Sequence, residues 1–170
     1  MSRGFVREGD QEEPVVIPQR AVLPDNVINY VTVNGMRELR EELERLENDF
    51  AGVSVEDEKE RRREQTLALG KIKLLQERMN AARLIHLEDQ PKDEIRFGAT
   101  VSFKNLSLKT NQVLTITGVD EANVAMQKIA FTTPIVRAIT GAKVGDVIHF
   151  KLGTNKSILS IEAIDYRHLV

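Results

Sequence analysis

The sequence predicts an α+β protein in which an N-terminal antiparallel two-helix coiled coil precedes an antiparallel sheet domain with one short helix. Between residues 36 and 82, apolar residues recur in two stretches at the alternating three- and four-residue spacing of a helical seam. After residue 95, short segments carry apolar residues at every second position, as strands with one buried face do. Helices that precede a separate sheet are typical of the α+β class.

Composition limits the function classes that fit. A chain of 170 residues, 41% of them hydrophobic, can bury one compact core and carry an accessory element. Its net charge of −2 does not indicate generic binding to nucleic acid or anionic membranes. The absence of cysteine excludes disulfides and thiolate catalysis, and no apolar stretch resembles a signal peptide or a membrane span. We therefore expect a soluble, cytoplasmic protein.

Residues 1–29 are predicted to form an extended or disordered arm. Three prolines interrupt this segment, and its short apolar pieces at residues 15–17 and 21–23 have no helical period. Two interpretations remain open. The apolar pieces dock on a partner or on the chain's own domain, or the arm is a solvated tail.

Residues 30–87 are predicted to form a helical hairpin. Asn34 is a candidate N-cap of the first helix, and Ser54, followed by Asp57, resembles a capping box at the start of the second. Residues 56–65 contain no apolar residue, so this part of the second helix should be a solvated overhang at the distal end. The two seams that should pair are Met36, Leu39, Leu43, Leu46 and Phe50, and Ala68, Ile72, Leu75, Met79 and Ala82.

Residues 88–94 read as a linker to a C-terminal domain over residues 95–170. Alternating apolar positions predict strands within residues 95–103, 112–118, 128–131, 147–152 and 157–166. A short helix is expected from Pro134 to Thr140, because Thr133 can cap it, proline suits its first position, and Gly141 can end it.

Several segments match one family in order. They are FGATV at 97–101, ITGVDEA at 116–122, IAFTTPIVRAITGAKVGD at 129–146 and IEAIDY at 161–166. This set resembles the C-terminal domain of the bacterial Gre-type transcript cleavage factors, the GreA/GreB family, in which a Ser-Pro-Ile-Ala-Arg-Ala-like helix precedes a Gly-Asp turn. The segments at 31–35, 39–43 and 80–85 also resemble the N-terminal hairpin of that family. The resemblance implies an FKBP-like fold for the C-terminal domain.

The resemblance implies an accessory transcription factor that binds RNA polymerase at the rim of its secondary channel. The docking loop of the family corresponds to Thr132, Thr133 and Pro134, with Arg137 beside it. Thr133 and Pro134 are equally explained by the start of the helix. In the family, acidic residues at the hairpin tip help to hold a second Mg²⁺ at the polymerase active site, so no stable metal or cofactor of the chain's own is expected.

The tip is where this chain departs from the family. The Gre tip motif is missing, a direct alignment places Ala51 and Ser54 at the positions of the tip acids, and the first helix is shorter by about 18 Å. These differences favour a regulator that competes for the channel over an efficient cleavage factor. In the alternative, Glu56, Asp57 and Glu58 form a relocated acidic tip. Those acids could equally complement the helix dipole and pair with Arg61 and Arg62.

Two further questions concern the charged overhang and intrinsic catalysis. Arg61, Arg62 and Arg63 are candidates to contact the 3′ end of the nascent RNA, although a solvated charged face explains them as well. The sequence contains no catalytic nucleophile paired with a general base, no metal-ligand cluster and no phosphate-binding loop, so it does not indicate an enzyme. An FKBP-like fold raises prolyl isomerase activity, but the chain has no tryptophan and only two tyrosines. A protein-interaction module with a partner other than polymerase remains the alternative class.

Overall fold

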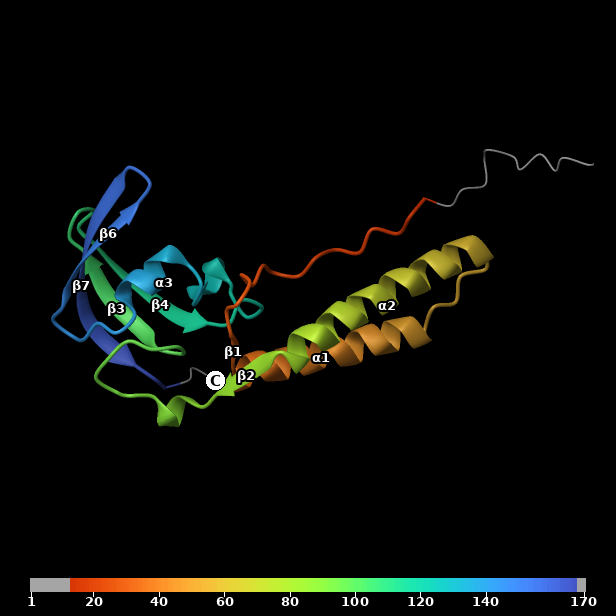
Figure 1. Cartoon of the computed structure of the whole chain (residues 1–170), viewed down its shortest axis with the longest axis horizontal. Helices are drawn as coiled ribbons and strands as arrows, with labels where there is room; N and C mark the ends of the chain where they lie inside the picture. Colours follow the sequence, from red (N-terminus) through yellow and green to blue (C-terminus); the bar gives the residue numbers. More distant parts are fainter. Residues whose placement is uncertain (1–12, 168–170) are drawn as a thin grey trace, which may run out of the picture.

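The computed structural model describes residues 13–167, so part of the predicted arm lies outside the described residues. A long helical hairpin projects from a curled sheet that carries one short helix (Figure 1), which confirms the predicted α+β class. No helix within residues 13–167 is long and apolar enough to cross a membrane. The elements are β1 (Asn29–Thr32), α1 (Val33–Ala51), α2 (Glu58–Asn80), β2 (Ala82–Ile85), η1 (Leu87–Asp89), β3 (Thr100–Asn105), β4 (Thr110–Thr117), η2 (Val124–Met126), β5 (Lys128–Ala130), α3 (Pro134–Ile139), β6 (Val147–Leu152) and β7 (Asn155–Asp165).

The predicted seams hold the hairpin together. Leu39 of α1 and Leu75 of α2 are buried, together with Val31 of β1, and they form one small apolar cluster. Other predicted seam residues pack against this cluster half-buried: Met36, Leu43, Leu46, Met79 and Ala82. Apolar burial along one stripe of each helix is what stabilises such a pair, because the other faces carry charge and gain little from contact.

Both predicted helix caps of the hairpin were wrong. The N-cap of α1 is Thr32 rather than Asn34, and its hydroxyl accepts a hydrogen bond from the Gly35 N–H at 2.8 Å. The N-cap of α2 is Asp57 rather than Ser54, and its carboxylate accepts from the Lys59 N–H at 2.8 Å. A carboxylate also complements the positive end of the helix dipole, so Asp57 is the stronger cap.

A short parallel sheet at the base of the hairpin was not predicted. β1 and β2 flank the hairpin in sequence and pair from Asn29 opposite Ala82 to Thr32 opposite Ile85. Parallel strands need a long crossover connection, and the whole hairpin supplies it. Because these strands each span only four residues and lack clear alternation, their pairing depends on the long-range geometry of the hairpin.

The second sheet has the strand order β5-β4-β3-β7-β6. Its β3–β4, β3–β7 and β6–β7 pairs are antiparallel, but β4 and β5 pair in parallel, so the sheet is mixed rather than antiparallel as predicted. The chain leaves β4 through a loop containing η2, not through a tight hairpin, and β5 therefore enters in the same direction as β4. β3 also begins later than predicted, since the chain turns at Phe97 and Gly98 first.

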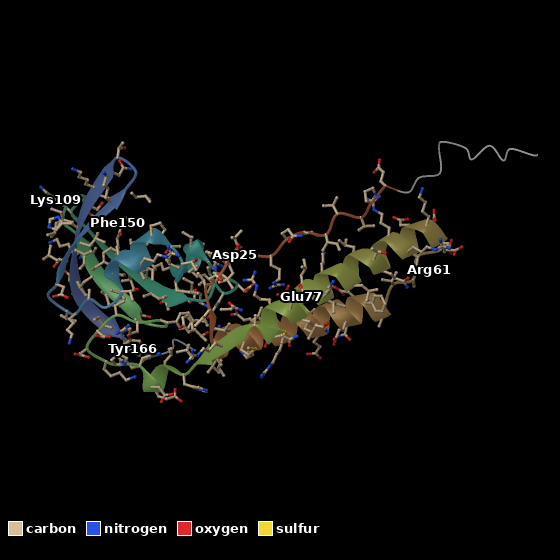
Figure 2. All side chains as sticks on the ribbon, viewed as in Figure 1. Asp25, Arg61, Glu77, Lys109, Phe150 and Tyr166 are labelled. Carbon is tan, nitrogen blue, oxygen red and sulfur yellow. The ribbon has the colours of Figure 1, made fainter. Side chains whose placement is uncertain are left out.

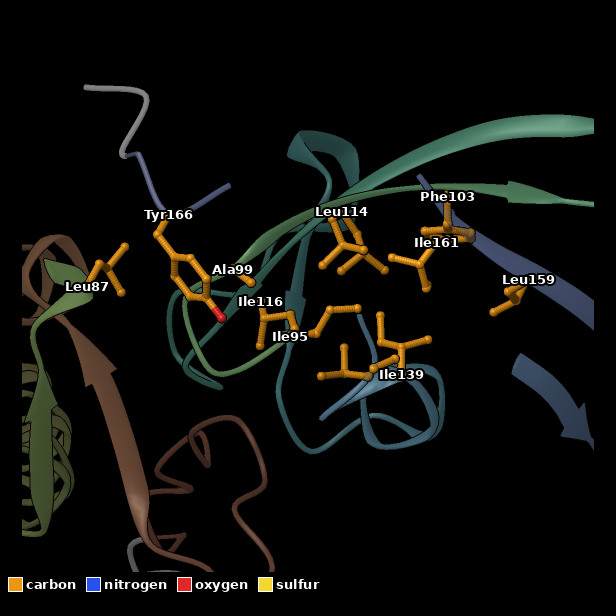
Figure 3. Close-up of a cluster of buried hydrophobic side chains, with 13 residues drawn as sticks. Leu87, Ile95, Ala99, Phe103, Leu114, Ile116, Ile139, Leu159, Ile161 and Tyr166 are labelled. Atoms are coloured by element: carbon orange, nitrogen blue, oxygen red, sulfur yellow. The ribbon is translucent and has the colours of Figure 1, made fainter. Parts of the chain in front are cut away.

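The core of the C-terminal unit, which we define as residues 87–167, lies between this sheet and α3 (Figure 3). Phe103 from β3 and Ile161 from β7 are each 1% exposed, and Ile139 from α3 is fully buried against the same cluster. Tyr166 closes the unit, because its hydroxyl donates to the Glu94 carbonyl at 2.6 Å and accepts from the Arg96 N–H at 2.8 Å. Sheet and helix thus form a firm platform for the loops around α3.

Candidate functional site

The distal end of the hairpin carries the candidate acidic tip. Residues 52–57 connect the helices, and α2 reaches farther out than α1 (Figure 1), as expected for a charged overhang. Glu56, Asp57 and Glu58 lie at this end and are all exposed. Three consecutive acidic residues therefore lie at the distal end of the hairpin.

Two of these carboxylates already have structural partners. Asp57 caps α2, and Glu58 forms an ion pair with Arg62 one turn later. Glu56 makes no hydrogen bond or ion pair with any residue in the described part of the chain. Within residues 13–167 no group of three His, Cys, Asp or Glu side chains is arranged to hold a metal ion. The tip is therefore an exposed acidic surface rather than a preformed metal site.

The candidate RNA contacts lie on the first turns of α2. Arg61 sits at the distal end of the hairpin (Figure 2), and Arg61 and Arg63 are exposed. Arg62 is engaged by Glu58, and Glu60 and Glu64 are interspersed among the arginines. The face therefore carries mixed charge, and its basic side chains are close to the tip acids.

The predicted docking loop borders a cavity between the base of the hairpin and the C-terminal unit. Thr132 and Arg137 line this cavity, which has a volume of about 510 Å³, whereas Thr133 and Pro134 do not. The Thr133 hydroxyl donates to the Ala130 carbonyl at 2.9 Å and makes no side-chain cap of α3. Pro134 and Arg137 are exposed.

Three aromatic rings gather at the same cavity. Tyr30, Phe97 and Phe131 lie with ring centroids 5.6 to 5.7 Å apart and at tilted or edge-on angles. The rings come from three distant segments, so the low aromatic content of the chain gave no sign of an aromatic-lined cavity. Arg83 and Arg96 also line it, which makes its polar rim basic.

A buried polar junction joins the hairpin base to the C-terminal unit. Glu121, which is 8% exposed, accepts hydrogen bonds from Thr32 Oγ1 at 2.6 Å and Asn34 Nδ2 at 3.1 Å. Lys128 Nζ lies 3.4 Å from the same carboxylate and supplies its counter-charge. Gly118 lets the backbones meet, because a Cβ there would lie 2.8 Å from the Tyr30 carbonyl oxygen.

Next to Glu121, Asp120 takes part in a second polar cluster. Arg20 from the N-terminal segment donates to Asp120 at 3.0 Å and to Glu42 of α1 at 2.8 and 3.0 Å. The hydrogen bonds from Arg20 hold the pKa of the Glu42 carboxyl below its usual value. Sequence reasoning missed this cluster, because its members are distant in sequence and carry no motif spacing. Only the ITGVDEA segment, which contains Asp120 and Glu121, had been singled out.

Several known transcription elongation factors are similar to this chain. A family model described as "Transcription elongation factor, GreA/GreB, C-term" matches residues 90–166. The transcription elongation factor GreA of Nitratidesulfovibrio vulgaris is 30% identical over 132 residues, which cover 69% of this chain and 81% of the relative. GreA of Baumannia cicadellinicola is 29% identical over 152 residues, covering 80% of this chain and 96% of the relative.

Two solved structures are also similar. The GreA factor homolog 1 of Thermus thermophilus has a TM-score of 0.38 at 20% identity, covering 80% of this chain and 97% of its own. GreA/GreB from Nitrosomonas europaea has a TM-score of 0.40 at 18% identity, covering 82% and 99%. The sequence matches decide the assignment, because the Nitratidesulfovibrio vulgaris relative is 30% identical over 81% of its own length. This chain belongs to the GreA/GreB family of transcription elongation factors.

Proposed function

We propose that this protein binds RNA polymerase through the loop before α3 and directs its hairpin toward the secondary channel. There it acts as a regulator that occupies the channel, and it stimulates transcript cleavage poorly. Any hydrolysis of RNA takes place at the active site of the polymerase. The segment at 129–146 that matches the family in sequence supports the docking part of this proposal.

The observation that carries the regulatory part is the state of the tip. A second Mg²⁺ needs carboxylate oxygens that are available at the end of a rigid arm. Here the Asp57 carboxylate is used by the backbone N–H groups of α2, and Glu58 is paired with Arg62. Glu56 alone has no partner among residues 13–167, and it lies in a connection rather than on a helix. One unengaged carboxylate on a loop is a weak ligand for a hydrated Mg²⁺.

Cleavage assays on backtracked elongation complexes with Mg²⁺ test this part. We expect the protein to release little 3′ RNA and to lower the activity of an added cleavage-competent Gre factor. The variant E56Q/D57N/E58Q removes the tip charges but keeps an asparagine that can cap α2. It should compete for the channel as well as the parent does, because occupancy depends on the docking loop and the hairpin.

The matched control for the tip is E44Q/E47Q/E77Q, which removes three exposed acids from the shaft of the hairpin. Robust RNA release by the parent that the tip variant abolishes and the shaft variant keeps would contradict the proposal. Such a result would establish the relocated acidic tip instead.

Replacing Arg137 with alanine should weaken binding to core polymerase by about tenfold, or roughly 1.4 kcal/mol, because an exposed arginine beside the docking loop is a common interface anchor. The fold should be unaffected, since Arg137 is exposed and makes no side-chain hydrogen bond or ion pair among the described residues. Titration of labelled protein against core polymerase, with circular dichroism of each variant, measures both quantities.

Lys151→Ala, an exposed change on β6, is the control for Arg137→Ala and should leave the affinity unchanged. If the parent itself does not bind core polymerase at micromolar concentration and low salt, the proposed function is wrong.

A further inference from the structure

The described part of the N-terminal segment lies along the hairpin. Residues 13–28, the part of the predicted arm that the structure describes before β1, run beside α2 back to the junction with the C-terminal unit (Figure 1). Ile17 packs onto α2 at Gly70, where a Cβ would lie 2.1 Å from Ile17 Cδ1. Arg78 Nη2 of α2 donates to the Ala21 carbonyl at 2.6 Å. The arm is therefore fixed to α2 by an apolar contact and by a hydrogen bond from the Arg78 side chain to the arm backbone.

Arg20 extends these contacts to two other parts of the molecule. Its guanidinium forms two hydrogen bonds with the Glu42 carboxylate of α1, at 2.8 and 3.0 Å. Two more reach Asp120 Oδ1, at 3.1 Å from Nε and 3.0 Å from Nη2. Asp120 follows β4 and so belongs to the C-terminal unit. One side chain of the arm thus bridges the hairpin and the C-terminal unit.

The bridge is part of a cluster of ion pairs in which three of the four side chains are largely shielded from water. Arg78 of α2 adds an ion pair with Asp120 at 3.3 Å, so two arginines face two carboxylates. The side chains of Arg20, Arg78 and Asp120 are only 17%, 13% and 10% exposed, and that of Glu42 is 34% exposed. Ion pairs at such positions are screened little by solvent, and a paired guanidinium fork fixes direction as well as distance.

We infer that the arm is a brace that fixes the direction of the hairpin relative to the C-terminal unit, with Arg20 as the positioning residue. The hairpin is a long lever, since α2 of 23 residues spans about 35 Å, and a rotation of 10° at its base moves the tip by about 6 Å. The parallel β1–β2 pair and the buried polar junction around Glu121 hold the base itself. The arm adds contacts farther from this base, at Glu42 and Gly70. A contact at a greater distance from the pivot opposes rotation of the hairpin with a larger torque.

The absence of cysteine makes a direct test straightforward. Spin labels at Ser54→Cys near the tip and at Thr154→Cys in the turn between β6 and β7 report the tip position by pulsed electron paramagnetic resonance. The parent should give one narrow distance distribution. Arg20→Gln, which keeps the stem but removes the charge, should broaden or shift it by about 5 Å or more. Arg40→Gln, an exposed arginine of α1, should leave it unchanged.

Two further variants keep the inference falsifiable. Asp120→Asn removes the partner of both arginines, so it should broaden the distribution more than Glu42→Gln, which breaks only the bridge through Arg20. Gly70→Leu displaces Ile17 without touching any charge, and it should loosen the hairpin although Gly70 does not contact the C-terminal unit. Circular dichroism of each variant checks that the helices persist, so that a broadened distribution reports direction and not unfolding.

An unchanged distribution in Arg20→Gln and Gly70→Leu would overturn the brace, whatever the protein does to transcription. The consequence for polymerase rests on the proposed function: a braced hairpin should occupy the channel more tightly than that of Arg20→Gln. If the distributions broaden as expected but the parent does not bind polymerase, the brace stands and the proposed function fails.

Discussion

Replacing Phe103 with alanine should lower the free energy of unfolding by about 3–5 kcal/mol, the largest effect expected of any single truncation in this chain. Phe103 is 1% exposed in the middle of β3, between β4 and β7, and it packs in the core that α3 covers. The substitution loses the free energy that the aromatic ring gains by leaving water for the core. It also leaves a cavity, because a closely packed sheet relaxes only in part.

Urea unfolding followed by circular dichroism measures this change. Val113→Ala on the adjacent strand β4 is the control, because Val113 is 41% exposed and its truncation should cost no more than about 0.5 kcal/mol. A loss below about 1 kcal/mol for Phe103→Ala would show that the sheet does not pack around this ring.

Replacing Leu75 with alanine should cost about 2–5 kcal/mol of hairpin stability. Leu75 is fully buried where α2 meets Leu39 of α1 and Val31 of β1, so it joins the helix pair to the strands at its base. Few other apolar residues of the hairpin are buried this deeply, and the charged overhang offers none. Loss of this one side chain therefore removes a large share of the contacts that keep the helices together.

Amide hydrogen exchange resolves this effect by region. In Leu75→Ala, amides of α1 and α2 should exchange faster by roughly 30-fold or more, the equivalent of about 2 kcal/mol, while those of β3 and β7 change less. Leu69→Ala makes the same truncation on the same helix at a side chain that is 51% exposed, and it should have little effect. Equal effects of the two variants would mean that the seam does not hold the hairpin.

The sequence predicted those parts of the fold that depend on local periodicity. The spacing of Leu39 and Leu43 identified the seam of α1, and β6 and α3 lie where alternation and Pro134 placed them. Such patterns work because one buried face imposes its period on the residues that form it. The family resemblance rested on the same kind of short, ordered segments.

The remaining features depend on residues that are distant in sequence. The parallel pairing of β1 with β2 needs the hairpin to return the chain to its starting point. Neither four-residue strand carries a local sequence pattern that predicts this pairing. Arg20, Glu42 and Asp120 meet only after both units have folded. Even the cap of α2 could not be assigned from spacing alone. Asp57 caps the helix rather than Ser54, because its negative charge also complements the helix dipole.

The strand pair at the base of the hairpin also makes the length of the hairpin independent of the position of the C-terminal unit. Because β1 and β2 hold the two ends of the hairpin side by side, residues can be added to or removed from α1 and α2 in equal number without moving the C-terminal unit. One heptad in each helix changes the length by about 10 Å and preserves the seam. The length of the hairpin can therefore vary independently of the C-terminal unit, and variants lengthened by one heptad in each helix would test this independence.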